Sequence, residues 1–128
     1  EVKLQKKLNA KAIVLINPVV DLRRDEPGPY TTVANWYLGD KDPTDSLVSH
    51  MTAKELSFLP PTIIMTCEKD LLKPQGVKLS ERLATHGVAT QTIDIPQKDH
   101  LGGFWAAGHS NADIAIDKTV KFILAESK

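Results

Sequence analysis

The feature that most constrains the fold is a continuously apolar run, TIIMTC, at residues 62–67. A helical segment and a second strand-like segment follow it. Such a run is typical of a strand covered on both faces, as in a parallel sheet. Residues 75–86 carry Leu79 and Leu83 at helical spacing and end at Gly87, a residue that commonly follows a helix. Residues 89–95, ATQTIDI, alternate between apolar and polar, which favours a half-exposed strand at an edge. The order of these segments predicts a parallel α/β unit.

Further segments extend this unit at both ends. Residues 12–20, AIVLINPVV, predict a first strand that stops near Ile16, because Asn17-Pro18 interrupts it. Residues 111–126 give the clearest helical pattern in the chain. The apolar stripe of that pattern consists of Ala112, Ile116, Val120, Ile123 and Leu124. We therefore expect residues 1–128 to form an α/β structure with three parallel strands and flanking helices.

Residues 21–60 differ from the rest of the chain. They hold four of the eight prolines, at positions 27, 29, 43 and 60, and only residues 31–38 have a helical pattern. We interpret this stretch as an excursion from the sheet that can carry a binding surface.

The first strand has a central-strand pattern although no strand precedes it. With right-handed crossovers, the later strands build away on one side and leave its other edge open. We expect further sheet upstream of Glu1, in the same or another chain, or a second copy of this chain, to pair with that edge.

Charge and composition exclude several classes of function. The net charge is zero and the pI is about 7.2, so no basic face for nucleic acid or an anionic membrane is indicated. The apolar runs are shorter than the ~20 residues of a transmembrane segment. The single cysteine, Cys67, excludes an intrachain disulfide, and together with the missing signal-peptide pattern it favours the cytoplasm. His50, His86 and His109 have no metal-ligand spacing, and we expect neither a metal nor a cofactor.

Two residues that could carry chemistry follow predicted strands. Asp70 comes shortly after the strand at 62–67, and His100 comes shortly after the strand at 89–95. Parallel strands end at one edge of the sheet, so the two side chains can meet there. An Asp that binds one imidazole nitrogen leaves the other to act as a general base. Asp70 could instead cap the following turn, and His100 could be a surface loop residue, although the nearby Gly102-Gly103 argues against an ordinary loop.

A competing nucleophile motif is weaker. Residues 108–112, GHSNA, nearly match G-x-S-x-G, but that motif requires a strand directly before the serine. Ser110 precedes a strong helix, with Asp113 three residues further on, and we interpret it as a helix N-cap. Cys67 lies in an apolar strand, where a core position is expected.

The string LPPTIIMTCEKDLLKPQGVKLSERLATHGVATQTIDIPQKDHLGGF resembles the C-terminal portion of α/β-hydrolases of the hormone-sensitive-lipase-like esterase family. Upstream, AIVLINPVVDL and WYLGDKDP resemble two further segments of that family. The matching positions are Leu59, Pro60, Pro61, Glu68, Asp70, Leu72, Arg82, Leu83, Gly87, Pro96, His100 and Phe104.

The resemblance implies a fold, an activity and a set of roles. The three strands would be the sixth to eighth of an α/β-hydrolase sheet, with Asp70 as the triad acid and His100 as the triad base, in the chain order Ser…Asp…His. The serine and the oxyanion hole would lie upstream of Glu1, in the N-terminal half of a serine carboxylic-ester hydrolase. The substrate would be a small ester, and Trp36, Tyr37 and Phe104 would line its pocket.

Two alternatives stay open. Trp36 and Tyr37 could pack in the core rather than line a pocket. The chain could also be a non-catalytic α/β module that pairs through its exposed first strand with a partner or a second copy.

Overall fold

The computed structural model of the chain describes residues 10–23, 31–46, 49–100 and 110–126. The chain divides into two compact units, which are described separately. The larger unit holds Glu1–Pro18 and Glu55–Lys128, and the smaller unit is Val19–Lys54.

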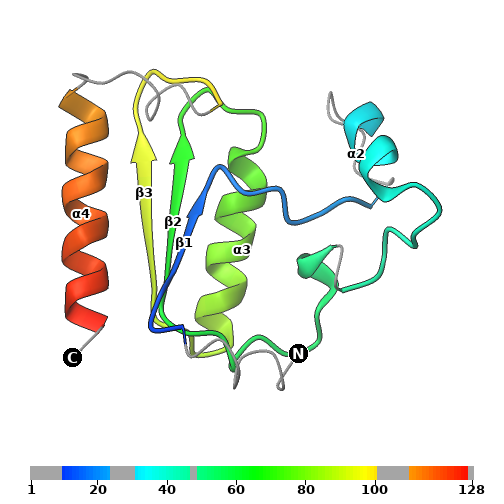
Figure 1. Ribbon diagram of the computed structural model, residues 1–128, viewed down its shortest axis with the longest axis horizontal. Helices are drawn as coiled ribbons and strands as arrows, with labels where there is room; N and C mark the ends of the chain where they lie inside the picture. Colours follow the sequence, from blue (N-terminus) through cyan, green and yellow to red (C-terminus); the bar gives the residue numbers. More distant parts are fainter. Residues whose placement is uncertain (1–9, 24–30, 47–48, 101–109, 127–128) are drawn as a thin grey trace. The chain divides into compact units, whose positions relative to one another are not determined.

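The larger unit is built on a parallel three-stranded sheet (Figure 1). Its strands are β1 (Ile13–Ile16), β2 (Thr62–Cys67) and β3 (Thr90–Ile95), and their order in the sheet is β1-β2-β3. Both neighbouring pairs are parallel. The three predicted strands and their parallel arrangement are thus confirmed, and β1 ends at Ile16 as the Asn17-Pro18 interruption predicts.

Burial along β2 and β3 follows the predicted patterns. All six residues of β2 are buried, as expected for a strand covered on both faces. In β3, Ile93 and Ile95 are buried, while Gln91, Thr92 and Asp94 are exposed. β3 therefore has the half-exposed character that its alternation predicts.

Helix α3 (Lys73–Thr85) covers one face of the sheet and contacts β2 and β3. It begins two residues earlier than predicted, with Pro74 in its first turn. A proline is tolerated there because the N–H groups of the first turn have no partner within the helix. It ends as predicted, because Gly87 adopts a left-handed φ of 75°. The N–H of Gly87 donates to the carbonyl of Ala84, and the N–H of Val88 donates to the carbonyl of Leu83, both at a distance of 3.0 Å. These two bonds form the Schellman arrangement that closes a helix.

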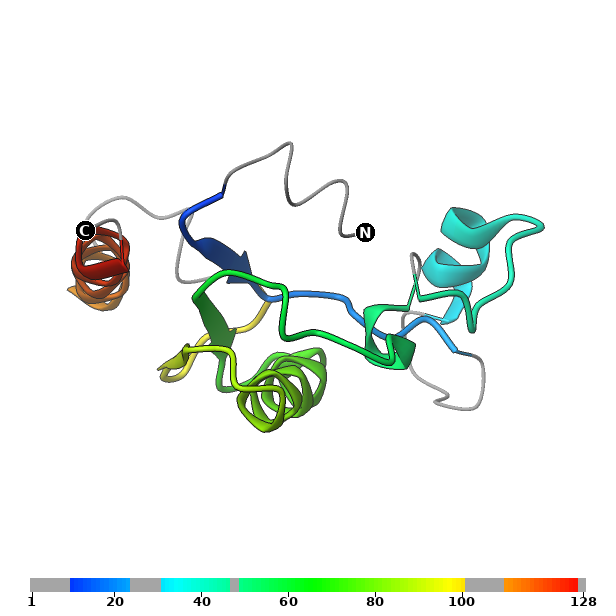
Figure 2. The same ribbon diagram turned by 90° about the horizontal axis from the view of Figure 1, so that it is seen from below.

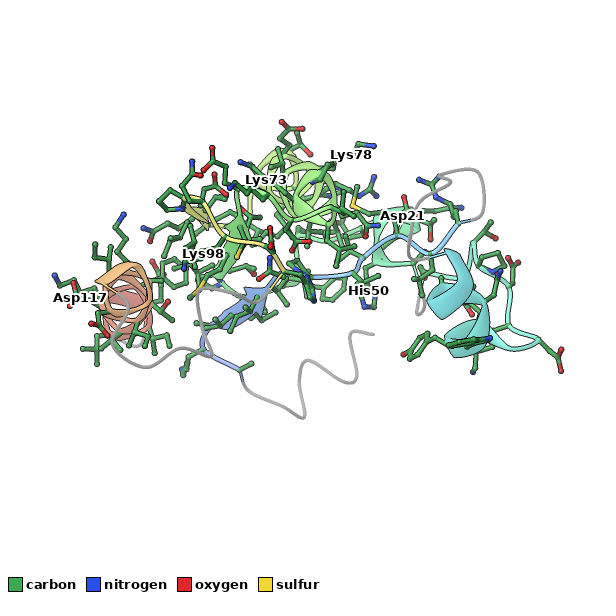
Figure 3. The ribbon with its side chains drawn as sticks, turned by 90° about the horizontal axis from the view of Figure 1, so that it is seen from above. Asp21, His50, Lys73, Lys78, Lys98 and Asp117 are labelled. Atoms are coloured by element: carbon green, nitrogen blue, oxygen red, sulfur yellow. The ribbon has the colours of Figure 1, made fainter. Side chains whose placement is uncertain are left out.

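Helix α4 (Ser110–Glu126) packs on β2 and β3 from the other side of the sheet (Figure 2). Ala115 is fully buried and Phe122 is partly buried against the core of this side. That core otherwise consists of Ile63, Met65, Cys67, Ile93 and Ile95. Thr119, between the two helix residues, approaches the Met65 sulfur at 4.0 Å. Figure 3 labels the exposed Asp117 on α4 and the exposed Lys78 on α3, together with Lys73 of α3, whose Nζ binds Asp94 of β3 at 2.6 Å.

The predicted apolar stripe of this helix is not the face that meets the sheet. Ile116, Val120, Ile123 and Leu124 are all exposed, and the side chain of Ala112 lies outside the described residues. The packed face is instead Ala115, Thr119 and Phe122, which share the spacing of one helix side.

A second correction concerns β1, whose continuous apolar run suggested burial on both faces. Val14 is 37% exposed and Ile16 is 40% exposed. By register they share a face with Ile63 and Met65, the side on which α4 packs over β2 and β3. Within the described residues, that face of β1 is therefore incompletely covered.

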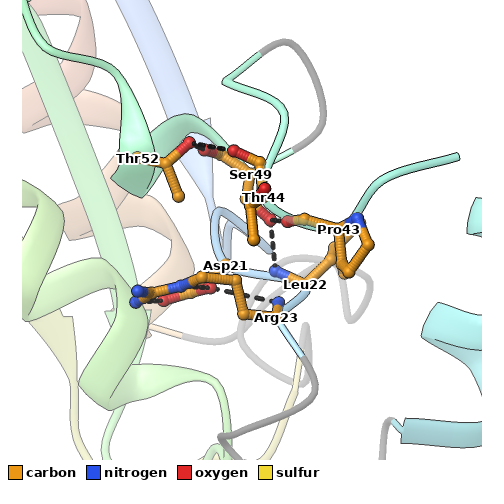
Figure 4. A network of polar contacts seen from close by, with 7 residues as sticks. All are labelled: Asp21, Leu22, Arg23, Pro43, Thr44, Ser49 and Thr52. Atoms are coloured by element: carbon orange, nitrogen blue, oxygen red, sulfur yellow. Dashed lines mark hydrogen bonds and ion pairs between the residues drawn. The ribbon is translucent and has the colours of Figure 1, made fainter.

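The smaller unit contains α2 (Thr31–Leu38), at the predicted position, and a short 3₁₀ helix, η1 (His50–Thr52). The fully buried Ser49 connects its segments (Figure 4). The Ser49 hydroxyl accepts a bond from the Leu22 N–H at 2.8 Å and donates to the Pro43 carbonyl at 2.6 Å. The Ser49 carbonyl accepts a bond from the Thr52 hydroxyl at 2.8 Å. One buried serine thus satisfies polar groups from three segments.

None of the helices in the described part of the chain has both the length and the apolar character needed to cross a membrane.

Candidate active site

The candidate site lies where two loops leave the C-terminal edge of the sheet. One loop follows β2 at residues 68–70, and the other follows β3 at residues 96–100. The Glu68 N–H donates to the Ile95 carbonyl at 2.9 Å, and the Lys69 N–H donates to the Lys98 carbonyl at 3.0 Å. These bonds continue the pairing of β2 and β3 beyond the strands and fix the two loops side by side.

The Glu68 side chain holds the second loop as well. Its Oε2 accepts the Gln97 N–H at 2.7 Å and the Gln97 side-chain Nε2 at 3.2 Å. Gln97 has a left-handed φ of 59°, which turns the chain after β3. Sequence reasoning included Glu68 in the family motif without a role, and the structure shows that it ties the loop carrying His100 to the loop carrying Asp70.

Asp70 and His100 meet at this edge. Nδ1 of His100 lies 2.9 Å from Oδ2 of Asp70. The Asp70 side chain is fully buried, whereas that of His100 is 38% exposed. Because a carboxylate only accepts hydrogen bonds, the imidazole proton belongs on Nδ1, which makes Nε2 the basic nitrogen of the neutral ring. The predicted meeting of the two side chains is therefore present.

Asp70 also takes part in the turn before α3. Its Oδ1 accepts the Leu72 N–H at 2.9 Å, and its backbone carbonyl accepts the Lys73 N–H at 3.1 Å. The sequence left two possibilities for Asp70, capping a turn or pairing with a histidine. The two carboxylate oxygens allow both at once.

A third donor to this carboxylate comes from Asn17, which sequence reasoning did not include in the site. Its side-chain Nδ2 donates to Asp70 Oδ2, the oxygen that also binds His100. Asn17 follows β1, is 4% exposed and has a left-handed φ of 45°. The available signal was a polar residue directly after an apolar strand that neighbours β2, which we interpreted only as the end of that strand.

The other predicted site residues lie elsewhere or outside the described residues. Trp36 and Tyr37 are on α2 of the smaller unit and are 79% and 75% exposed, so they do not pack in the core of the described residues. Phe104 lies outside the described residues, as does the side chain of Ser110 on which its capping role depends. Cys67 is fully buried in the core, as predicted.

In the part of the chain that the structure describes, no group of three or more His, Cys, Asp and Glu side chains could hold a metal ion. The site's chemistry is that of a buried carboxylate paired with a partly exposed imidazole. Such a pair can accept a proton at Nε2 and return it to a leaving group.

Comparisons with known proteins bear on the fold of the chain. A family model described as "alpha/beta hydrolase fold" matches residues 1–106. No curated protein matches the chain in sequence.

Three solved structures with similar folds are proteins about twice as long. An esterase/lipase from an uncultured bacterium is 17% identical, with a TM-score of 0.81 over 98% of this chain and 47% of its own. EstE5, from crystals soaked with p-nitrophenyl butyrate, is 18% identical, with a TM-score of 0.81 and the same two coverages. A hormone-sensitive lipase from a metagenome library is 24% identical, with a TM-score of 0.80 over 98% of this chain and 48% of its own.

The chain thus spans about half the length of the solved structures it resembles. The family match covers residues 1–106, which include the three parallel strands. The chain belongs to the α/β-hydrolase fold family, the family that its motif string predicts.

Proposed function

We propose that this chain supplies the acid and the base of a serine carboxylic-ester hydrolase. The observation that carries the proposal is the buried Asp70 carboxylate bound to His100 Nδ1 at the C-terminal edge of an α/β-hydrolase sheet. This edge is where open α/β sheets hold their ligands.

In the proposed reaction, His100 takes the proton of a serine hydroxyl as that oxygen attacks the ester carbonyl. The same nitrogen then protonates the departing alcohol, and a second cycle with water releases the acid. Asp70 keeps the imidazole in the required tautomer and stabilises its charged form. The serine and the oxyanion donors belong to a segment that we place upstream of Glu1, in the same gene product or in a second chain.

The proposed substrate is a small ester. The structural relatives include an esterase/lipase, and EstE5 was soaked with p-nitrophenyl butyrate. Residues 21–60 would contribute to the substrate pocket, with Trp36, Tyr37 and Phe104 as its aromatic residues. The exposure of Trp36 and Tyr37 supports a binding role over a core role.

A second candidate function is supported by β1. This strand lies at one end of the described sheet order and has Val14 and Ile16 partly exposed. A non-catalytic module could use this strand to pair with a partner strand or with a second copy of the chain.

Site variants of the full-length protein that contains this chain test the leading proposal, with p-nitrophenyl butyrate as the substrate. Asp70→Asn and His100→Ala should each lower kcat/KM by ~10³-fold or more, because each removes a member of the triad. Ser110→Ala should leave the rate nearly unchanged, since we assign Ser110 to a helix cap.

Two matched controls keep the chemistry of these substitutions but change residues outside the site. Asp117→Asn removes an exposed carboxylate of α4, and His86→Ala removes a histidine at the end of α3. Both should stay within about twofold of wild type. An unchanged rate in Asp70→Asn or His100→Ala, or a hydrolysis activity lost in Ser110→Ala alone, would contradict the proposal.

A further inference from the structure

We propose that Asn17 is a positioning residue of this site, which holds the Asp70 carboxylate and moderates its attraction for the His100 ring. This inference rests on the proposed function, because it assigns a role within the same Asp–His pair. It concerns a residue outside the Asp70–His100 motif, directly after β1, the strand that pairs with β2 on the side opposite β3.

The first observation is a shared acceptor. The Asn17 Nδ2 and the His100 Nδ1 both bind Oδ2 of Asp70, while the Leu72 N–H binds Oδ1. The negative charge on Oδ2 is therefore divided between an amide donor and the imidazole. A hydrogen bond donated to a carboxylate stabilises its charged form and lowers its basicity.

The second observation is that the Asn17 side chain is held in one orientation. The Cys67 thiol donates to Asn17 Oδ1, with the sulfur 3.7 Å from the oxygen. The amide oxygen thus faces a weak donor, and the amide nitrogen faces the carboxylate. The reverse orientation would place two acceptor oxygens together beside Asp70. Cys67 is fully buried and Asn17 is 4% exposed, so little water competes for these groups.

The third observation is the backbone of Asn17. Its N–H still donates to the Met65 carbonyl at 2.9 Å, which continues the pairing of β1 with β2 by one residue. Its φ of 45° is left-handed, a conformation that asparagine tolerates better than most residues. The turned backbone and the donating side chain together suit asparagine at this position, where an apolar residue would lose both features.

The consequence for the proposed reaction is a balance. Asp70 must stabilise the imidazolium that forms when His100 takes a proton, but an Oδ2 without the amide donor would hold that proton more strongly. Removing Asn17 should therefore strengthen the attraction of Oδ2 for the protonated ring, so that His100 gives its proton less readily to the departing alcohol.

Asn17→Gly in the full-length protein is the test variant, since glycine keeps the left-handed backbone and removes only the side chain. We expect kcat for p-nitrophenyl butyrate to fall about 10-fold with KM within about twofold of wild type. In the pH profile of kcat/KM, the midpoint of the acidic limb should move to higher pH by ~0.5–1 unit. The charged residues of the two loops, Glu68, Lys69, Lys98 and Asp99, are the same in both proteins.

Gln97→Gly is the matched control. Gln97 is the other non-glycine residue with a left-handed φ in the described part of the chain. This exchange makes the same change of backbone freedom next to the site. It removes the Gln97 side-chain donor to Glu68 at 3.2 Å but keeps the backbone N–H donor at 2.7 Å, and it removes no donor to Asp70. It should leave the acidic limb where it is in wild type.

A double-mutant cycle with Asp70→Asn separates positioning from general structural damage. If Asn17 acts through Asp70, adding Asn17→Gly to Asp70→Asn should change the residual kcat by no more than about twofold. An equal 10-fold loss in both backgrounds, or an acidic limb that stays in place in Asn17→Gly, would overturn the positioning role.

Proton NMR of the same full-length variants gives a readout that does not depend on activity. Asn17→Gly should move the resonance of the His100 Nδ1 proton downfield, because its bond to Oδ2 strengthens, and leave the ring resonances of His86 in place. A downfield shift in a protein without esterase activity would support the role of Asn17 and reject the proposed function. An unmoved resonance in an active esterase would reject the role of Asn17 alone.

Discussion

At the scale of single residues, the site depends on the burial of one carboxylate. The Asp70 side chain has no exposed surface, and a buried carboxylate without partners would be costly by several kcal/mol. Its oxygens accept bonds from Asn17, Leu72 and His100, which belong to three separate segments. These donors offset the desolvation of Asp70 and connect the ends of β1, β2 and β3 at a single point.

A second acid, Glu55, allows a pH-dependent prediction. Its carboxylate accepts the Ser57 N–H at 2.7 Å and lies 3.1 Å from His86 Nδ1. The bonds from Ser57, and then the one from His86, lower the pKa of Glu55 from 4.5 to about 2. A group with a lowered folded pKa stabilises the fold above its unfolded pKa, and this contribution disappears as the pH falls through the folded value.

Glu55→Gln should therefore be less stable than wild type above pH 4.5, and the difference should shrink as the pH falls toward about 2. Urea unfolding of both proteins across this range measures the effect. Glu81→Gln, which changes an exposed acid of α3, is the control and should leave the pH dependence of unfolding as in wild type. A difference between Glu55→Gln and wild type that is constant with pH would contradict the assignment.

At the scale of secondary-structure elements, the sequence predicted which helices and strands exist and their order better than it predicted which face of a helix packs on the sheet. The strands follow from their hydrophobic patterns, and the paired loops of Asp70 and His100 follow from parallel strand ends. The pattern of α4 predicted an apolar stripe, but Ala115 and Phe122 form the face that packs. Periodicity identifies apolar faces, whereas the choice between them depends on which side chains fit the sheet.

The roles of Asn17 and Glu68 could not be predicted for a related reason. Both roles depend on a left-handed backbone conformation. For Asn17 it is the residue's own, and for Glu68 it is that of Gln97, whose N–H donates to the Glu68 carboxylate. Asparagine tolerates a left-handed conformation better than most residues, but its presence alone does not say that the chain adopts one at that position. The sequence therefore predicted that Asp70 and His100 meet, but it did not predict that Asn17 and Glu68 hold their side chain and loop in place.

The packing of α3 on β2 leads to a prediction for Gly76. A Cβ at this position would lie 2.8 Å from Thr66 Cγ2 and 3.5 Å from Ile64 Cγ2. In an open helix, Gly→Ala would stabilise by ~1 kcal/mol, but overpacking against a strand costs ~1–3 kcal/mol. Gly76→Ala should thus lower the free energy of unfolding by ~1 kcal/mol, measured by urea denaturation.

A second substitution shows whether the methyl of Thr66 is the cause. Thr66→Ser removes Cγ2 and keeps the hydroxyl, which donates to Asp94 at 2.7 Å. In this background, Gly76→Ala should become neutral or stabilising by up to ~1 kcal/mol. A loss of the same size in both backgrounds would show that the cost arises elsewhere.

At the scale of the whole chain, the larger unit leaves apolar side chains exposed on β1 and on α4. On β1 these are Val14 and Ile16, and their face of the sheet is the one on which α4 packs over β2 and β3. On α4 they are Ile114, Ile116, Val120, Ile123 and Leu124. Exposed apolar side chains on an edge strand favour pairing with another chain.

We therefore predict that the isolated 128-residue chain self-associates through β1, and sedimentation velocity over a range of concentrations measures this. Val14→Lys should weaken the association about 10-fold or more, because a lysine on an edge strand opposes strand pairing. Val77→Lys is a matched control, since Val77 is also 37% exposed but lies on α3, and it should associate as wild type does. A monodisperse monomer at all concentrations, or equal weakening by the two lysines, would contradict pairing through β1. Association that disappears only in Val14→Lys would identify β1 as the edge that another part of the hydrolase, or a second copy, covers.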